Sequence, residues 1–327
     1  MAAPKMAVIN KPMIANEGIQ FDHNYAAVVP PVDPLYVPFG NYEDVMAITQ
    51  SGKFFPYWIY GLSGNGKTFS IEQAHAQANK KLVLVPITKE ADEDSLLGGL
   101  RLQDGNTVPF YGPVTMAALL GCTVCLDEVD LGDAKLMCLQ TPLQNRPFLI
   151  KRLGKLITPQ EGFNIVATAN TKGQGNDDGK FIGANIMNEA MLDRFYNLFE
   201  QEYPSPEVEK IILTKVLEAL GHATYKETFF IERLLAWAQN VRELYKTDPN
   251  NEIITTRRLV TICRSYDMYG KDRQKALRRS LTRFKPHVQK AFLDCYKLID
   301  TEWNEKEKEA KRIEEAKKKG LDPETGF

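Results

Sequence analysis

The stretch Gly61-Leu62-Ser63-Gly64-Asn65-Gly66-Lys67-Thr68 decides the fold, because it matches the phosphate-loop pattern G-x-x-x-x-G-K-[ST] at every fixed position. The aromatic run 57–60 before it predicts a buried strand, and residues 69–79 after it predict a helix. Three glycines let the backbone turn its N–H groups toward phosphate oxygens, and the helix adds the positive end of its dipole. We therefore expect ATP here, with Lys67 at the β- and γ-phosphates and the Thr68 hydroxyl on Mg²⁺. A chance glycine-rich turn, the alternative, would not have matching flanks.

Composition and charge narrow the class of protein. The chain has 327 residues, of which 43% are hydrophobic and 25% charged, which is typical of a globular protein with one large and one smaller domain. A net charge of -1 favours neither a nucleic-acid nor an anionic-membrane partner, so such contacts would need a local patch. We expect no membrane segment and no signal peptide, hence a cytoplasmic protein. Five cysteines, an odd number, fit a reducing compartment.

An acidic pair ends a second buried strand. Residues 82–87 and 123–126 are continuously apolar, which predicts strands of a parallel sheet covered on both faces. The second run ends in Asp127 and Glu128. We expect Asp127 to hold Mg²⁺ together with Thr68, and Glu128 to polarise the attacking water. An acidic loop at a strand end is the alternative, which the upstream phosphate loop disfavours.

Cys122 and Cys125 form a C-x-x-C pattern, which can indicate zinc or redox chemistry. They lie at the start of a predicted strand, no second pair follows, and the four histidines are scattered along the chain. We therefore expect both cysteines to be small buried hydrophobic residues.

A further strand, residues 163–169, ends in Asn170. This position places an amide at the carboxyl end of a parallel sheet, where ligands bind. Asn170 is therefore a candidate for positioning the lytic water, with an ordinary strand-to-loop asparagine as the alternative. The Gly- and Asp-rich loop 171–183 is a candidate pore or partner loop, and residues 191–195 close the next helix.

The remaining patterns predict four parts in chain order. These are an irregular arm at 1–38, an α/β nucleotide-binding domain at 39–203, a helical lid at 204–300 and a charged helical tail at 301–327. The predicted fold class is α/β, a phosphate-loop parallel sheet flanked by helices, with a β-hairpin insertion and a C-terminal α-helical lid.

Helices and hairpins fill in these parts. Further helices are expected at 39–51, 114–120 and 133–143, and hairpins at 100–110 and 148–157; the lid helices are expected at 207–219, 229–245, 256–268, 273–284 and from Pro286 onward. For the basic residues between 271 and 290, a solvated face is favoured over a site for nucleic acid or an acidic partner.

The order of these motifs resembles the AAA+ ATPases of the MoxR/CobS-like group, in the dynein-related AAA branch. The phosphate loop carries the resemblance, together with the runs 124–128, 167–170 and 192–195. The segment from Asp94 to Pro113 is similar to the insertion in the second helix of that group. Runs 167–175 and 31–37 are most similar to the ATPase subunits of cobaltochelatase. The resemblance spans about residues 31–268.

The resemblance implies an ATPase that hydrolyses Mg-ATP between the subunits of a hexameric homo-oligomeric ring and remodels a protein client. Arg194 matches the arginine finger that enters the neighbouring subunit's site. A salt bridge to Asp193 is the alternative role. Arg257 matches the second sensor of the lid, although the adjacent Arg258 leaves the register open. The client implied by the family is a metal-binding subunit with a von Willebrand A-type domain.

Two other functions stay open. The chain could be an assembly or scaffold protein in which ATP only sets the oligomeric state, or a nucleic-acid-associated motor. The presence of Lys67, Glu128, Asn170 and Arg194 favours hydrolysis, because a scaffold need not keep a hydrolytic base. The sequence shows no added DNA-reading domain, which makes the motor the weaker alternative.

Overall fold

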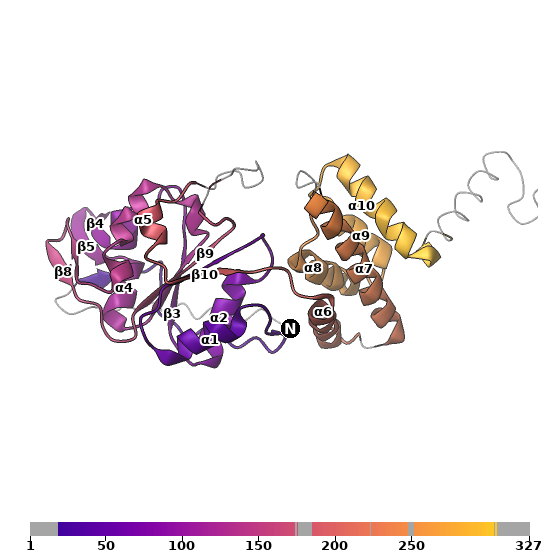
Figure 1. Cartoon of the computed structure of the whole chain (residues 1–327), viewed down its shortest axis with the longest axis horizontal. Helices are drawn as coiled ribbons and strands as arrows, with labels where there is room; N and C mark the ends of the chain where they lie inside the picture. The colour runs from indigo at the N-terminus through magenta and orange to yellow at the C-terminus, as the bar shows by residue number, and fades with distance from the viewer. Residues whose placement is uncertain are drawn as a thin grey trace, which may run out of the picture. The chain divides into compact units, whose positions relative to one another are not determined.

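The computed structural model describes residues 19–173, 175, 185–222, 224–247, 252–303 and 305. The chain divides into two compact units, Met1–Glu202 and Tyr203–Phe327, which are described separately (Figure 1). Part of the expected arm (1–18), most of the expected loop 171–183 and most of the expected tail lie outside the described residues.

The first unit is built on a five-stranded sheet in the order β10-β2-β9-β6-β3, in which every neighbouring pair is parallel. The strands are β2 (Tyr57–Tyr60), β3 (Leu82–Pro86), β6 (Thr123–Asp127), β9 (Asn164–Ala169) and β10 (Asn197–Glu200). The sequence patterns predicted all of these except β10. Because the strands are parallel, their carboxyl ends share one edge of the sheet.

Both faces of this sheet are covered. Tyr57 and Ile59 of β2 pack in a core cluster with residues of α1 (Tyr42–Ser51) and α2 (Lys67–Gln77), while the alternate residue Trp58 lies in a larger cluster with α4 (Pro113–Leu120). Figure 1 shows α1 and α2 side by side. This two-sided burial explains the continuous apolar runs, and it confirms the predicted α/β class.

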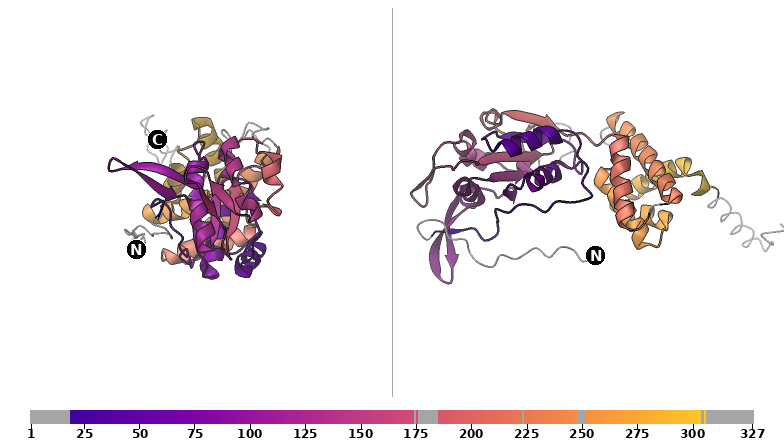
Figure 2. Two further views of the ribbon diagram at one scale, coloured as in Figure 1. Left: turned by 90° about the vertical axis from the view of Figure 1, so that its left-hand side faces the viewer. Right: turned by 90° about the horizontal axis from the view of Figure 1, so that it is seen from below.

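Two hairpins of the described residues form sheets separate from the five-stranded sheet. After the short α3 (Glu93–Leu96), β4 (Gly98–Gln103) and β5 (Asn106–Tyr111) pair antiparallel and project from the unit, as Figure 2 shows. The two-residue arm strand β1 (Gln20–Phe21) adds parallel to β5. The second hairpin pairs β7 (Phe148–Ile150) with β8 (Lys155–Ile157).

A buried glutamine fixes the arm to α2. Gln73, which is 3% exposed, donates from Nε2 to the carbonyl of Pro31 at 3.1 Å and accepts from the Asp33 N–H at 2.8 Å. Val28 forms an antiparallel bridge with Leu82, at the start of β3. The arm therefore continues the packing of the sheet unit.

The expected helix at 133–143 is wrong in type. The chain forms the 3₁₀ turns η3 (Ala134–Leu139) and η4 (Pro142–Gln144), which follow η2 (Val129–Leu131). Pro142 has no N–H to donate and its ring obstructs the preceding turn, so an α-helix cannot continue through it. The next helix, α5, is only Glu189–Leu192.

The second unit is helical. It contains α6 (Pro206–Ala219), α7 (Tyr225–Thr247), α8 (Thr256–Met268), α9 (Arg273–Ser280) and α10 (Pro286–Ile299), so α7 is longer and α9 shorter than predicted. The Ser205 hydroxyl caps α6 by accepting from the Val208 N–H at 3.4 Å. Among the described residues, no helix has the length and apolarity needed to cross a membrane.

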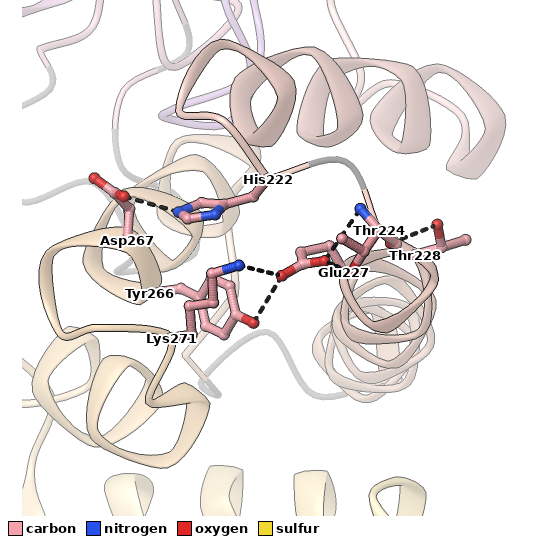
Figure 3. A network of polar contacts seen from close by, with 7 residues as sticks. All are labelled: His222, Thr224, Glu227, Thr228, Tyr266, Asp267 and Lys271. Atoms are coloured by element: carbon pink, nitrogen blue, oxygen red, sulfur yellow. Dashed lines mark hydrogen bonds and ion pairs between the residues drawn. The ribbon is translucent and has the colours of Figure 1, made fainter.

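A buried carboxylate joins α7 to α8 within this unit (Figure 3). Glu227 accepts hydrogen bonds from the Tyr266 hydroxyl at 3.2 Å and from Lys271 Nζ at 3.4 Å, and also from Thr224. Nearby, the ring of His222 bonds Asp267 Oδ1 at 2.8 Å. These polar contacts fix the start of α7 against the end of α8.

Candidate nucleotide-binding site

The phosphate loop joins β2 to α2 at the carboxyl edge of the sheet, where only glycine fits two of its positions. Gly61 has φ 147°, and a Cβ there would lie 2.2 Å from the carbonyl oxygen of Gln201. Gly66 caps the N-terminus of α2 with φ 92°. The conformation therefore depends on glycine and leaves the first N–H groups of α2 at the loop.

The side chain of Lys67, the first residue of α2, folds back onto the backbone of the phosphate loop. Its ammonium donates to the carbonyls of Gly61 at 2.7 Å and Leu62 at 3.0 Å, and it lies 3.3 Å from Oδ1 of Asn170. Only 8% of the residue is exposed. This places a positive charge beside the inward-facing backbone, as binding of phosphate oxygens requires.

Two threonine hydroxyls form hydrogen bonds with Asp127, at the acidic end of β6. Thr68 Oγ1 donates to Asp127 Oδ1 at 2.6 Å, and Thr168 Oγ1 of β9 donates to the same oxygen at 2.5 Å. The Glu128 N–H in turn donates to Thr168 Oγ1 at 3.1 Å. The sequence motif 167–170 included Thr168, but its role as the link between β9 and β6 was not predicted.

The donors present fit Mg²⁺. Thr68 and Asp127 offer a hydroxyl and a carboxylate oxygen, which suit this ion because it usually keeps several waters and phosphate oxygens of the substrate. Burial raises the pKa of Glu72, one turn along α2 from Thr68, and the charge of Asp127 adds to the rise. A cation bound beside Asp127 would offset the negative charge that adds to this rise. No group of three or more metal-binding residues occurs in the described ranges.

Glu128 and Asn170 follow neighbouring strands. Glu128 is exposed and has φ 55°, a conformation that is costly for a residue with a side chain and frequent at functional sites. Asn170 follows β9, and its side chain contacts Lys67. The structure thus pairs Lys67 with Asn170 and its neighbour Thr68 with Asp127, and Glu128 directly follows Asp127.

Two contact residues of this edge were missed by the sequence analysis. The side chain of Asp130, in η2, accepts hydrogen bonds from Asn170 and Thr171. Gln201, which follows the unpredicted β10, accepts from Asn65 Nδ2 through its carbonyl and from Asn41 Nδ2 through its side chain at 3.4 Å. Their partners lie far away in sequence, so no local pattern could reveal either residue.

The C-x-x-C cysteines lie apart from this chemistry. Cys122 and Cys125 are free thiols and both are buried, as expected. Burial raises the pKa of Cys122 to about 11 and that of Cys125 well above its ordinary value. Both thiols therefore stay protonated at neutral pH, which disfavours nucleophilic or metal chemistry.

Arg194 lies beyond α5 and makes none of the contacts of the phosphate loop. Its guanidinium donates to the carbonyl of Ala190, and with the Gln144 amide turned to face it, Nε and Nη2 donate to the amide oxygen at 2.9 and 3.2 Å. Within the described part of the chain, Asp193 forms no ion pair with it.

Arg257 and Arg258 differ in the second unit. Arg258 donates from Nη1 to the carbonyl of Ser280 at 3.0 Å, lies 6.0 Å from the ring centre of Phe284 and is half-buried. Arg257 is the second residue of α8, is exposed, and shows no side-chain partner among the described residues.

Comparisons with known proteins agree with this geometry. Residues 56–195 match the family model described as AAA domain (dynein-related subfamily). The chain is 24% identical over 250 residues to aerobic cobaltochelatase subunit CobS of a Sinorhizobium species, covering 75% of this chain and 74% of that protein. It is 30% identical over 139 residues to protein NorQ of Paracoccus denitrificans (strain Pd 1222), covering 42% of this chain and 51% of NorQ. It is 27% identical over 164 residues to midasin of Dictyostelium discoideum, covering 49% of this chain and 3% of midasin. The chain therefore spans only part of the last two relatives.

Proposed function

We propose that the chain is a ring-forming ATPase motor whose catalytic sites are shared between neighbouring copies, on the basis of the AAA domain of the dynein-related subfamily that residues 56–195 match. The observation that carries this proposal is the separation of two sets of residues. Lys67, Thr68, Asp127 and Asn170 are joined by contacts at one edge of the sheet, whereas Arg194 contacts only Ala190 and Gln144 among the described residues. As a finger, this guanidinium would exchange its hydrogen bonds to Ala190 and Gln144 for the phosphate oxygens in the site of another copy.

Each residue of the proposed site has a distinct task. The loop 61–68, with Lys67, binds the β- and γ-phosphates through its N–H groups and ammonium. Thr68 and Asp127 would hold Mg²⁺, which would supply positive charge to the phosphate oxygens. Glu128 orients and polarises the attacking water, and Asn170 positions that water against the γ-phosphate.

The second sensor is assigned to Arg257. Arg258 is engaged with Ser280 and Phe284, which supports a structural role for it, whereas Arg257 is exposed at the start of α8. The charge-swap pair Arg257→Glu and Arg258→Glu would separate these roles, since only the first should lower turnover while leaving the fold intact.

We further propose that the motor remodels a protein client. The relative named as a cobaltochelatase subunit is one part of a larger enzyme, which supports a partner protein for this chain as well. A subunit with a von Willebrand A-type metal-binding domain is the proposed class of client. A hexamer is the proposed ring.

Mixing two inactive variants tests the shared site. Lys67→Ala should fail to bind ATP, and Arg194→Ala should bind ATP but hydrolyse it poorly. In a 1:1 mixture, about one interface in four would join an intact phosphate loop to an intact finger, so about a quarter of wild-type turnover should return.

The outcomes separate the candidate functions. A monomer in sedimentation that keeps a full hydrolysis rate, with no recovery on mixing, would contradict the shared site and leave Arg194 a structural role. Nucleotide-dependent assembly without turnover would instead favour the scaffold, and stimulation by DNA or RNA alone would favour the nucleic-acid motor.

A further inference from the structure

A buried carboxylate lies two residues after Glu128. Asp130 is the middle residue of η2 and is 0% exposed. An ionised carboxylate is seldom fully buried, because its loss of hydration is costly unless hydrogen bonds replace the water. The hydrogen-bond partners of the Asp130 carboxylate therefore indicate its role.

Among the described residues, the side chain of Asp130 forms hydrogen bonds only with the two residues that follow β9. Its Oδ2 accepts from the N–H of Asn170 at 3.0 Å, the N–H of Thr171 at 3.0 Å and the hydroxyl of Thr171 at 3.1 Å. Its Oδ1 has no hydrogen-bond partner among the described residues. One carboxylate oxygen thus fixes the backbone at the point where the Asn170 side chain leaves it.

We propose that Asp130 is a positioning residue that sets Asn170 opposite Glu128. The proposal rests on the proposed function of those two residues. Thr168, in β9, holds the Glu128 N–H at 3.1 Å, and Asp130, after β6, holds the Asn170 N–H at 3.0 Å. Hydrogen bonds therefore join the end of β6 to the end of β9 in both directions. These bonds fix the separation between the Glu128 carboxylate and the Asn170 amide.

The same turn also holds the chain that returns from the loop. The Asp130 carbonyl accepts from the Asn185 N–H at 2.8 Å, and Asn185 Nδ2 donates to the carbonyl of Gly132 at 2.8 Å. Three residues after Asn185, Asn188 caps α5, and Arg194 follows that helix. Asp130 consequently joins the position of Asn170 to that of the segment carrying the finger.

Paired substitutions test the role of the carboxylate. Asp130→Ala removes the acceptor, whereas Asp130→Asn can present its amide oxygen to the same three donors. In the assembled protein, kcat should fall about 10- to 100-fold in Asp130→Ala, since a displacement of about 1 Å costs that much. Asp130→Asn should recover most of the loss, and the Kd for a non-hydrolysable Mg-ATP analogue should change less than about 3-fold in both.

Thr171 supplies a second pair in case Asp130→Ala does not fold. Thr171→Val removes the hydroxyl donor and Thr171→Ser keeps it, so only the valine variant should lower kcat. Equal kcat in both, or a loss of kcat in Asp130→Asn as large as in Asp130→Ala, would overturn the proposal. So would a parallel loss of nucleotide affinity, because that result would indicate general damage to the site.

Amide hydrogen exchange provides a readout that needs no turnover. The N–H groups of Asn170 and Thr171 should exchange faster in Asp130→Ala than in Asp130→Asn, with the exchange of β3 unchanged as an internal control. Unchanged exchange would overturn the inference. If the wild-type protein hydrolysed no ATP, the proposed function would fail while the exchange measurement still decided whether Asp130 holds Asn170.

Discussion

The hydroxyl of Thr168 is the smallest group on which the geometry of the site depends. It donates to Asp127 Oδ1 at 2.5 Å and accepts from the Glu128 N–H at 3.1 Å, while the residue is fully buried. Thr168→Val keeps the shape of the side chain but leaves these two groups unpaired, which should cost about 1–3 kcal/mol. We expect kcat to fall about 10-fold and the Mg²⁺ requirement to rise.

Thr168→Ser is the matched control, since it keeps the hydroxyl and loses only a methyl group. Steady-state hydrolysis over a Mg²⁺ titration would compare the two variants. If the valine variant were as active as the serine variant, the hydroxyl would have no part in holding Asp127 and Glu128.

Lys67 and Glu128 should separate binding from hydrolysis. Lys67→Ala removes the ammonium at the loop, and at about 1.5–3 kcal/mol for each charge-assisted hydrogen bond, ATP affinity should fall at least ~100-fold. Glu128→Gln keeps Asp127, the proposed magnesium ligand, and removes the proposed base, so affinity should stay near wild type while turnover falls by about 10²- to 10⁴-fold. Nucleotide titration and phosphate release measure the two effects, with the exposed Lys80→Ala as control. Wild-type turnover in Glu128→Gln would mean that the base lies elsewhere.

At the scale of elements, the attachment of the arm depends on one amide of α2. Gln73 bonds both the carbonyl of Pro31 and the N–H of Asp33. Gln73→Leu keeps the volume but leaves these two groups without their partner. Limited proteolysis should then cut the arm near residues 29–34 several-fold faster, whereas Gln77→Leu on the exposed side of α2 should change nothing. Equal cleavage rates would show that β1 and the Val28 bridge hold the arm alone.

The contact between α7 and α8 should depend on pH. Burial alone would raise the pKa of Glu227, but hydrogen bonds from Thr224, its own backbone, Tyr266 and Lys271 lower it to about 2 from the ordinary 4.5. The carboxylate thus stabilises the folded unit above pH about 4.5, and this contribution is lost as the pH falls toward 2.

Urea unfolding of the full chain at several pH values checks this dependence. Glu227→Gln should be less stable than wild type at pH 7, and the difference should shrink as the pH falls below about 4.5. Glu232→Gln, which removes an exposed ion pair with Lys210, should follow wild type. A constant difference between Glu227→Gln and wild type across this range would contradict the role of the charge.

The sequence predicted those features that a contiguous motif encodes, and it missed those that depend on residues far apart in the chain. The phosphate loop and the acidic end of β6 are contiguous patterns, and the α/β class followed from them. Strand β10 was missed because it is an edge strand, bonded only to β2, and most of its residues are exposed, so its apolar pattern is short. Asp130 was missed because its partners lie about 40 residues away.

At the scale of the whole molecule, a shared site makes activity depend on assembly. A single copy would lack the finger, so turnover per copy should rise with protein concentration until rings are complete. Arg194→Ala should instead give a low rate that stays flat over the same range. Sedimentation and hydrolysis measured on the same dilution series would test this, and a constant rate per copy for the wild type would contradict it.

The pairing of β10 with β2 also has a consequence for synthesis. Strand β2 ends at Tyr60, but its outer neighbour β10 begins only at Asn197, and Gln201 then lies against Gly61 and accepts a hydrogen bond from Asn65 of the phosphate loop. Pairing over such a separation is slow, and an unpaired strand edge invites aggregation. A nascent chain that already contains the complete phosphate loop therefore has both sides of β2 open until β9 emerges, and its outer side stays open until β10, the last strand of the sheet, has followed.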